Sequence, residues 1–282
     1  MPASAQSQEL QYLLVVVGLF IVPRVLQRFR VPTAVTSVGL GAVLGMGFDL
    51  LHGDAAVPLL ATLGIVALFL FAGLEVDFGE LRAGLRVTAG HVAVWLVVLA
   101  AGTWAAGAVL ELDRRAALLF ALAVFTPSTG FILDSLPGFG LGERQRFWVK
   151  TKAIASELVA LVALFVVVQS HSAESLGLST LALVAMIVAL PVIFQLFAAR
   201  VLPFAPRSEF AFLLILSLVC AYVTRHLGVY YLVGAFVVGV TAVRLRQRLP
   251  ALASERLLIG IELFASFFIP FYFFKEIGRA HV

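Results

Sequence analysis

Charged residues are scarce in this chain: Asp, Glu, Lys and Arg make up 13% of its 282 residues, whereas a soluble domain carries about 25%. Hydrophobic residues make up 62%, and the mean hydropathy is +1.06. So little charge excludes an ordinary soluble globular domain. Backbone polar groups in lipid are satisfied by helices or closed barrels, and the long apolar segments described below favour helices. We therefore expect an all-α membrane protein embedded in a lipid bilayer.

Cysteine is nearly absent as well. The single cysteine, Cys220, lies in an apolar segment, which excludes a disulfide framework and a thiolate metal site. Motifs for a catalytic nucleophile, a phosphate-binding loop or a metal-ligand cluster are also missing. The basic residues lie in short loops between apolar segments, where they set orientation rather than bind polyanions. The sequence therefore predicts no enzyme activity, no resident metal or cofactor, and no nucleic-acid partner.

Long apolar segments are what the chain has in abundance. A helix that crosses the ~30 Å hydrocarbon core of a bilayer needs about 17–25 residues, and ten segments of about that length are present. They cover residues 10–27, 33–51, 56–75, 87–110, 116–136, 147–169, 176–202, 208–226, 228–243 and 255–275. Two of them carry pairs of small residues at the spacing of close helix packing, Gly41 with Gly45 and Ala235 with Gly239.

The basic residues indicate how these segments alternate across the membrane. Loops and ends that follow even-numbered segments hold Arg114, Arg115 and Arg225, whereas those that follow odd-numbered segments hold fifteen lysines and arginines. Basic residues accumulate in cytoplasmic loops. We therefore expect the N-terminus to lie outside. The alternation of the basic residues also supports the count of ten segments, because one missed segment would have destroyed it.

Two neighbouring segments carry polar groups near their centres. Glu157 lies about halfway along the sixth segment, where a carboxylate costs several kcal/mol unless it is paired or hydrated. The fifth segment is interrupted by Thr126-Pro127-Ser128-Thr129-Gly130. From the predicted orientation, both features lie about 15 Å deep. A broken helix beside a buried acid is how many secondary transporters form a cation site at the membrane midplane.

This pair of segments predicts a binding site for protons and monovalent cations. Glu157 would bind either a proton or a cation but not both, and this competition makes the exchange obligatory. Ser156 would add an oxygen ligand, and the hydroxyls of Thr126, Ser128 and Thr129, with carbonyls freed by the break, would complete a hard oxygen site for Na⁺ or K⁺.

Plainer alternatives exist for these residues and their neighbours. Glu157 would be structural if it paired with Lys150 or Lys152 on its own helix, and Lys150 is two turns away on the same face. The hydroxyls in the break would then bond back to the preceding turn. We expect Asp134 to be a solvated charge near a helix end and Glu75 to be an interfacial carboxylate, with accessory roles in cation access as the alternative for each.

Several motifs together resemble a known family. They are FLFAGLEVD (69–77), the TPSTG break (126–130), the acid-bearing helix that follows it, GAFVVG (234–239) and SFFIPFYFF (266–274). Their order and spacing resemble those of the monovalent cation:proton antiporter-2 family, that is, the sodium/proton exchanger transmembrane domain, which includes Kef-type potassium/proton systems. The resemblance extends over nearly the whole chain.

The resemblance implies inverted repeats, with crossing broken helices that form a core moving against a dimerisation domain. It therefore implies a homodimer, and we expect a multi-pass protein of a bacterial inner membrane. The family's proton- and cation-binding aspartate, usually preceded by Asn, Asp or Gln, falls on Glu157, with Ser156 before it. Glu keeps the charge and adds a methylene, whereas Ser is shorter than the usual amide. Lys275 departs from the small residues and glycine that the family usually has there.

Length is a second departure, because the resemblance implies twelve or thirteen spans and this sequence ends after ten. Residues 276–282 look like a translated sequencing adapter. The expected organisation is therefore a partial exchanger domain over residues 1–275, incomplete at its C-terminus, and a non-native tail.

The function that the sequence predicts is secondary active transport, in which Na⁺ or K⁺ is exchanged for protons. Two alternatives stay open. One is a gated Kef-type potassium efflux channel with the same architecture and passive flux. The other is a membrane fragment that does not transport.

Overall fold

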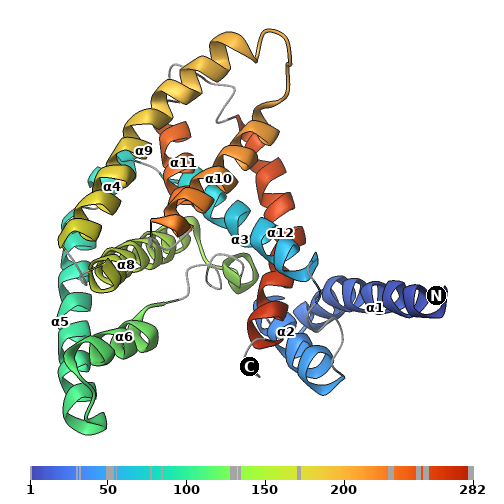
Figure 1. The fold of residues 1–282 in the computed structure, drawn as a ribbon, viewed down its shortest axis with the longest axis horizontal. Helices are drawn as coiled ribbons and strands as arrows, with labels where there is room; N and C mark the ends of the chain where they lie inside the picture. Colours follow the sequence, from blue (N-terminus) through green and yellow to red (C-terminus); the bar gives the residue numbers. More distant parts are fainter. Residues whose placement is uncertain are drawn as a thin grey trace.

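The chain is an assembly of helices. The computed structural model describes residues 2–29, 31, 33–48, 54, 56–76, 78–83, 85–127, 132, 135–169, 173–227, 232–245, 249 and 254–278. In chain order the elements are α1 (Pro2–Gln27), α2 (Thr33–Leu40), the π-helix η1 (Gly41–Gly47), α3 (Ala56–Leu74), α4 (Phe78–Ala83), α5 (Leu85–Leu110), α6 (Arg114–Phe125), the 3₁₀ helix η2 (Leu136–Phe139), α8 (Glu143–Gln169), α9 (Ala173–Arg200), α10 (Glu209–His226), α11 (Leu232–Arg244) and α12 (Glu255–Gly278) (Figure 1). Every regular element in these ranges is helical, which confirms the predicted all-α class.

Six of these helices are long and apolar enough to cross a membrane. They contain the segments Glu9–Leu26, Ala56–Leu74, Leu85–Leu110, Gly177–Arg200, Glu209–His226 and Glu255–Lys275. Shorter apolar helices lie at Val35–Leu44 and Leu232–Arg244. Large apolar side chains on the outer faces are exposed, for example Trp104 at 76% and Val109 at 78% on α5. Surfaces of this kind suit lipid, so the protein is an integral multi-pass membrane protein, and each of the ten segments predicted from the sequence overlaps a helix.

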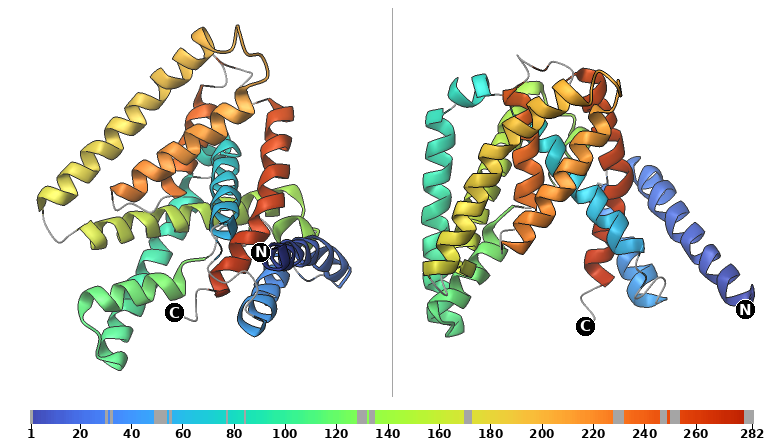
Figure 2. Two further views of the ribbon diagram at one scale, coloured as in Figure 1. Left: turned by 45° about the vertical axis from the view of Figure 1, so that its right-hand side comes forward. Right: turned by 45° about the horizontal axis from the view of Figure 1, so that its top comes forward.

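Helix α3 lies at the centre of the fold. It packs against α10, α11 and α12, and both figures show it running between these helices (Figures 1 and 2). Of its 19 residues, 12 are buried, and several of these form the main core with residues such as Phe236 on α11 and Ile269 on α12. The run that includes FLFAGLE is thus the end of the most buried helix among the described residues.

Glycines allow α3 to approach its neighbours closely. A Cβ atom on Gly239 of α11 would lie 2.3 Å from the carbonyl oxygen of Leu70, and one on Gly73 would lie 2.3 Å from the carbonyl oxygen of Phe236. On the α12 side, a Cβ atom on Gly64 would lie 2.4 Å from a backbone atom of Phe268. Because all these contacts are with backbone, only glycine fits at the crossings. The close packing predicted around Gly239 is confirmed.

The start of α3 is tied to α1. Asp54 accepts a hydrogen bond from the backbone N–H of Ala56 at 2.7 Å, as a residue preceding a helix does. Its other carboxylate oxygen accepts one from the Tyr12 hydroxyl. The Tyr12 hydroxyl, helped by backbone N–H groups, holds the pKa of Asp54 below its ordinary value.

A second apolar cluster joins α5, α6 and α8. It contains Trp95 and Leu99 from α5, Ala121 and Leu122 from α6, and Ala160 from α8. Helix α5 runs along one edge of the molecule, as Figure 1 and the right-hand view of Figure 2 show. Of the polar groups singled out in the sequence, Ser156 and Glu157 lie on α8, and Thr126 directly follows α6.

Candidate functional site

The break predicted in the fifth segment is present. Helix α6 begins with the Asp113 carboxylate accepting from the N–H groups of Arg115 and Ala116, and it ends at Phe125. Thr126 leaves the helix with φ −80° and ψ 121°, and its N–H still bonds the carbonyl of Leu122 at 3.0 Å. The residue before a proline avoids the helical conformation, so Pro127 accounts for the stop.

The end of α6 leaves polar groups without helical partners. The carbonyl of Phe125 accepts a hydrogen bond from the indole Nε1 of Trp95 on α5 at 3.2 Å. Thr126 Oγ1 is buried and bonds no other atom in the part of the chain that the structure describes. This hydroxyl is therefore not bonded back to the preceding turn there. Ser128, Thr129 and Asp134 lie outside the described residues, so their predicted roles stay predictions.

Ser156 lies in the interface between α8 and α5. Its side chain is 1% exposed, and its Oγ lies 2.9 Å from Nε2 of His91 on α5. His91 and Trp95 are four residues apart on α5, about one helical turn. The acid-bearing helix and the broken end of α6 thus contact α5 one turn apart, which brings the two halves of the predicted site to neighbouring levels.

Glu157 follows Ser156 on α8. Its side chain is only partly exposed, and its Oε2 atom is buried. One turn further along α8, Ala160 packs in the apolar cluster that includes Trp95 and Leu122. This stretch of α8 is therefore packed against α5 and α6 rather than lying at the molecule's outer edge.

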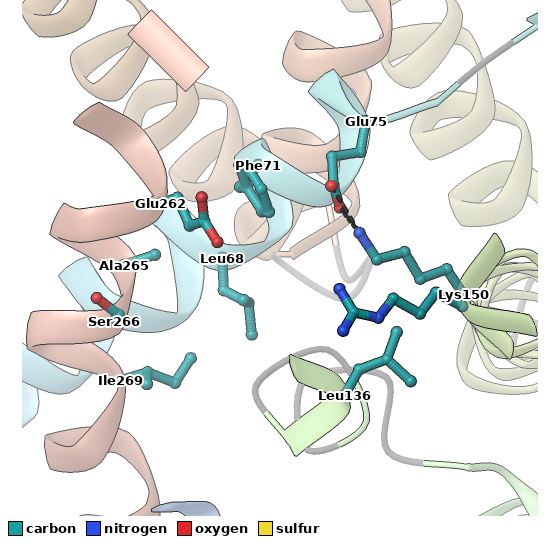
Figure 3. Close-up of a pocket in the computed structure, with 10 residues that line it drawn as sticks. Leu68, Phe71, Glu75, Leu136, Lys150, Glu262, Ala265, Ser266 and Ile269 are labelled. Atoms are coloured by element: carbon teal, nitrogen blue, oxygen red, sulfur yellow. Dashed lines mark hydrogen bonds and ion pairs between the residues drawn. The ribbon is translucent and has the colours of Figure 1, made fainter. Parts of the chain in front are cut away.

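Lys150 contacts a different carboxylate from the one considered in the sequence. Its Nζ lies 2.6 and 2.7 Å from the two carboxylate oxygens of Glu75, at the end of α3. The two side chains are 30% and 26% exposed, and Figure 3 shows the pair joining α8 to α3. The ion pair joins the end of α3 to α8 and directs the Lys150 ammonium to α3.

This ion pair borders a polar cavity of about 330 Å³. The cavity lies between the end of α3, the N-terminal half of α8 and the middle of α12, and its polar lining comes from Glu75, Arg146, Lys150, Glu262 and Ser266. In Figure 3, Glu262 and Ser266 project from α12 on the side opposite Lys150. Arg146 Nε is buried and bonds no other described atom. Two carboxylates and two cationic groups therefore line one hollow, on whose α12 side Glu262 and Ser266 are exposed.

The sequence reasoning missed Glu262 and undervalued His91. Glu262 lies about two turns into the last apolar helix, so the argument applied to Glu157 would have found it. His91 lies more than a turn inside α5. Its contact with Ser156 joins residues 65 apart in the sequence, and no local pattern indicates that.

A resident metal site is not indicated by the described residues, since no group of three His, Cys, Asp or Glu residues gathers there. Thr126, Ser156 and Glu157 carry oxygen atoms, which are the ligands that hard cations prefer.

Comparison with known proteins supplies the last observations on this site. The family model described as "Sodium/hydrogen exchanger, transmembrane" matches residues 15–275 of the chain. Among curated proteins, the chain is similar to the "Probable Na(+)/H(+) antiporter 3" of Methanocaldococcus jannaschii. The two are 26% identical over 229 residues, which make up 79% of this chain and 59% of the archaeal protein. The chain thus spans less than two thirds of that relative's length.

Proposed function

Because the chain belongs to the sodium/hydrogen exchanger transmembrane family, whose members are transporters rather than enzymes, we propose that it exchanges a monovalent cation, Na⁺ or K⁺, for protons. Glu157 is the group that binds either ion in turn. Ser156, Thr126 and the hydroxyls of Ser128 and Thr129 supply further oxygens. The homodimer, the bacterial inner membrane and the outside N-terminus are further parts of this proposal.

The observation that carries the proposal is the meeting of two helices on one face of α5. Ser156, next to Glu157, contacts His91, and the broken end of α6 contacts Trp95 one turn away. An acid inside a membrane segment marks an ion pathway by default. Here it lies beside a helix end whose Thr126 hydroxyl is buried with no described partner. A dehydrated cation would find a carboxylate and hydroxyl oxygens together.

The polar cavity offers a route to this site. Lys150 and Glu157 are seven residues apart, nearly two full turns, so they share a face of α8 about 10 Å apart. The cavity lies between the end of the third segment, the beginning of the sixth and the middle of the tenth. Alternating orientation places the end of the third segment and the beginning of the sixth on one side of the membrane, and the distribution of basic residues makes that side cytoplasmic. Cations and protons would then reach Glu157 from the cytoplasm through this cavity.

The test is cation-coupled proton flux in proteoliposomes. An imposed pH gradient should drive Na⁺ or K⁺ uphill with the wild-type protein. Glu157→Gln should abolish this movement, because an amide binds neither a proton nor a cation strongly, whereas Glu157→Asp should retain part of it. Glu143→Gln is the matched control, since Glu143 lies exposed in the first turn of the same helix.

Three results would contradict the proposal in different ways. Passive cation flux that the pH gradient cannot drive uphill would indicate a channel of the Kef kind. Unchanged coupled flux with Glu157→Gln would remove that residue from the mechanism. No flux with the wild-type protein in liposomes, although it is folded, would favour a membrane protein that does not transport.

A further inference from the structure

Two polar side chains of α5 reach two different helices. His91 contacts Ser156 on α8 through Nε2 and Oγ at 2.9 Å, and Trp95 donates to the Phe125 carbonyl at the end of α6 at 3.2 Å. Apart from these contacts, α5 is apolar over most of its length and exposes residues such as Val97, at 68%, on its outer face. The polar contacts of α5 are therefore directed at the two helices that carry the proposed site.

The partner of a serine hydroxyl decides what else that hydroxyl can bind. A hydroxyl has one hydrogen to donate and two lone pairs to offer. When Ser156 donates its hydrogen to the imidazole of His91, both lone pairs of Oγ stay available to a cation. Because Ser156 is 1% exposed, bulk water does not replace His91 as its partner. Without the imidazole, the hydroxyl is free to rotate toward the nearest acceptor.

We propose that His91 is a positioning residue that sets the affinity of the site for its cation by holding the hydroxyl of Ser156. The inference rests on the proposed exchange function and assigns a role to a residue outside the binding oxygens. His91 acts through Ser156 and does not itself contact the cation. Trp95 holds the other half of the site in the same way, because the indole N–H is only a donor and fixes the last carbonyl of α6.

A merely structural contact between α5 and α8 would behave differently. Its loss would lower the thermal stability and reduce the amount of active protein, which lowers the maximal rate. The concentration of cation at half-maximal rate would stay the same. A positioning role predicts the reverse, that is, a weaker apparent affinity with a maximal rate close to that of the wild type.

The experiment measures Na⁺- and K⁺-dependent dissipation of a pH gradient in proteoliposomes, with the cation concentration varied. His91→Leu should raise the half-saturating concentration about two- to twelvefold, which is what the loss of one hydrogen bond gives, and leave the maximal rate within about twofold. His91→Gln should restore the wild-type value, because the amide can accept from the hydroxyl. Thr103→Val is the matched control, since the Thr103 hydroxyl bonds back to the carbonyl of Leu99 on the same helix.

A double-mutant cycle tests whether His91 acts through Ser156. Ser156→Ala should raise the half-saturating concentration at least as much as His91→Leu does, because it removes the hydroxyl itself, and the double variant should be no worse than Ser156→Ala alone. Additive effects would overturn the proposal. So would an unchanged half-saturating concentration in His91→Leu, or a failure of His91→Gln to restore it.

A binding measurement separates this inference from the proposed function. Na⁺ and K⁺ titrations of the thermal unfolding of purified protein report binding without transport. If the wild-type protein does not exchange ions but is stabilised by a cation, the exchange proposal fails. The inference about His91 is then decided by whether His91→Leu shifts the midpoint of the cation titration. If wild-type exchange depends on Glu157 and His91→Leu titrates like wild type, only the inference about His91 fails. The absence of both exchange and cation stabilisation overturns both.

Discussion

Replacing Gly239 by alanine should destabilise the crossing of α11 and α3, although alanine is normally the better helix former. The added Cβ would lie 2.3 Å from the carbonyl oxygen of Leu70 and 2.8 Å from the N atom of Leu74, whereas ordinary contacts begin at 3.4 Å. The helices would have to separate by about 1 Å, and overpacking of this kind costs about 1–3 kcal/mol. The gain from replacing a helical glycine, about 0.5–1 kcal/mol, does not offset that loss.

Helix α9 offers a control with the opposite sign. Gly177 has no atom within 4 Å of the position of an added Cβ, so Gly177→Ala should stabilise the protein by the helix-propensity gain alone. In thermal unfolding of detergent-solubilised protein, Gly239→Ala should lower the apparent melting temperature by several degrees, because each kcal/mol of lost stability lowers it by about 2–4 °C. Gly177→Ala should raise it slightly. A melting temperature for Gly239→Ala equal to or above that of the wild type would refute the close approach of these helices.

Two further predictions concern the ends of α3. Lys150→Met should lower the free energy of unfolding by about 1 kcal/mol, which lies between the values for exposed and buried ion pairs. A double-mutant cycle with Glu75→Gln should show that most of this loss comes from the interaction between the two side chains. Additive effects of the two substitutions would contradict that. At the other end, the depressed pKa of Asp54 means that its contribution to stability is complete above the ordinary pKa of an aspartate and is lost as the pH falls through the lowered value. Below about pH 4, the melting temperature should therefore fall more steeply with decreasing pH for the wild type than for Tyr12→Phe. The same dependence on pH in both proteins would contradict the hydrogen bond between Tyr12 and Asp54.

The positions of the helices could be predicted because length and apolarity determine them. The segment predicted at residues 56–75 is α3, and that at residues 87–110 is α5 within two residues. Pro127 gave the break after Phe125 for a local steric reason. The sequence also singled out Gly239 by its spacing, but not its partner Leu70 on another helix.

The contacts that make the candidate site could not be predicted in the same way. Glu75 meets Lys150 across 75 residues, and His91 meets Ser156 across 65. Such pairings depend on how whole helices pack, and no periodicity within one segment encodes that. Glu262 is a different case, because the reasoning used for Glu157 applied to it equally. Like Glu157, it is an acidic residue within a long apolar segment, so it could be identified from the sequence of the last helix.

The cavity between α3, α8 and α12 has a consequence for the energetics of the proposed transport. In that proposal the cavity opens to the cytoplasm alone, so it communicates with a single aqueous compartment. The occupancy of any ion inside it is in equilibrium with the salt and acidity of that compartment alone. In the proposed exchange, work can be extracted from a gradient only after the cavity closes to this reservoir and the bound ion becomes exposed to the opposite one. Helix α8 carries both Lys150, which lines the cavity, and Glu157, the proposed ion-binding residue, so it is the helix that would link these two events.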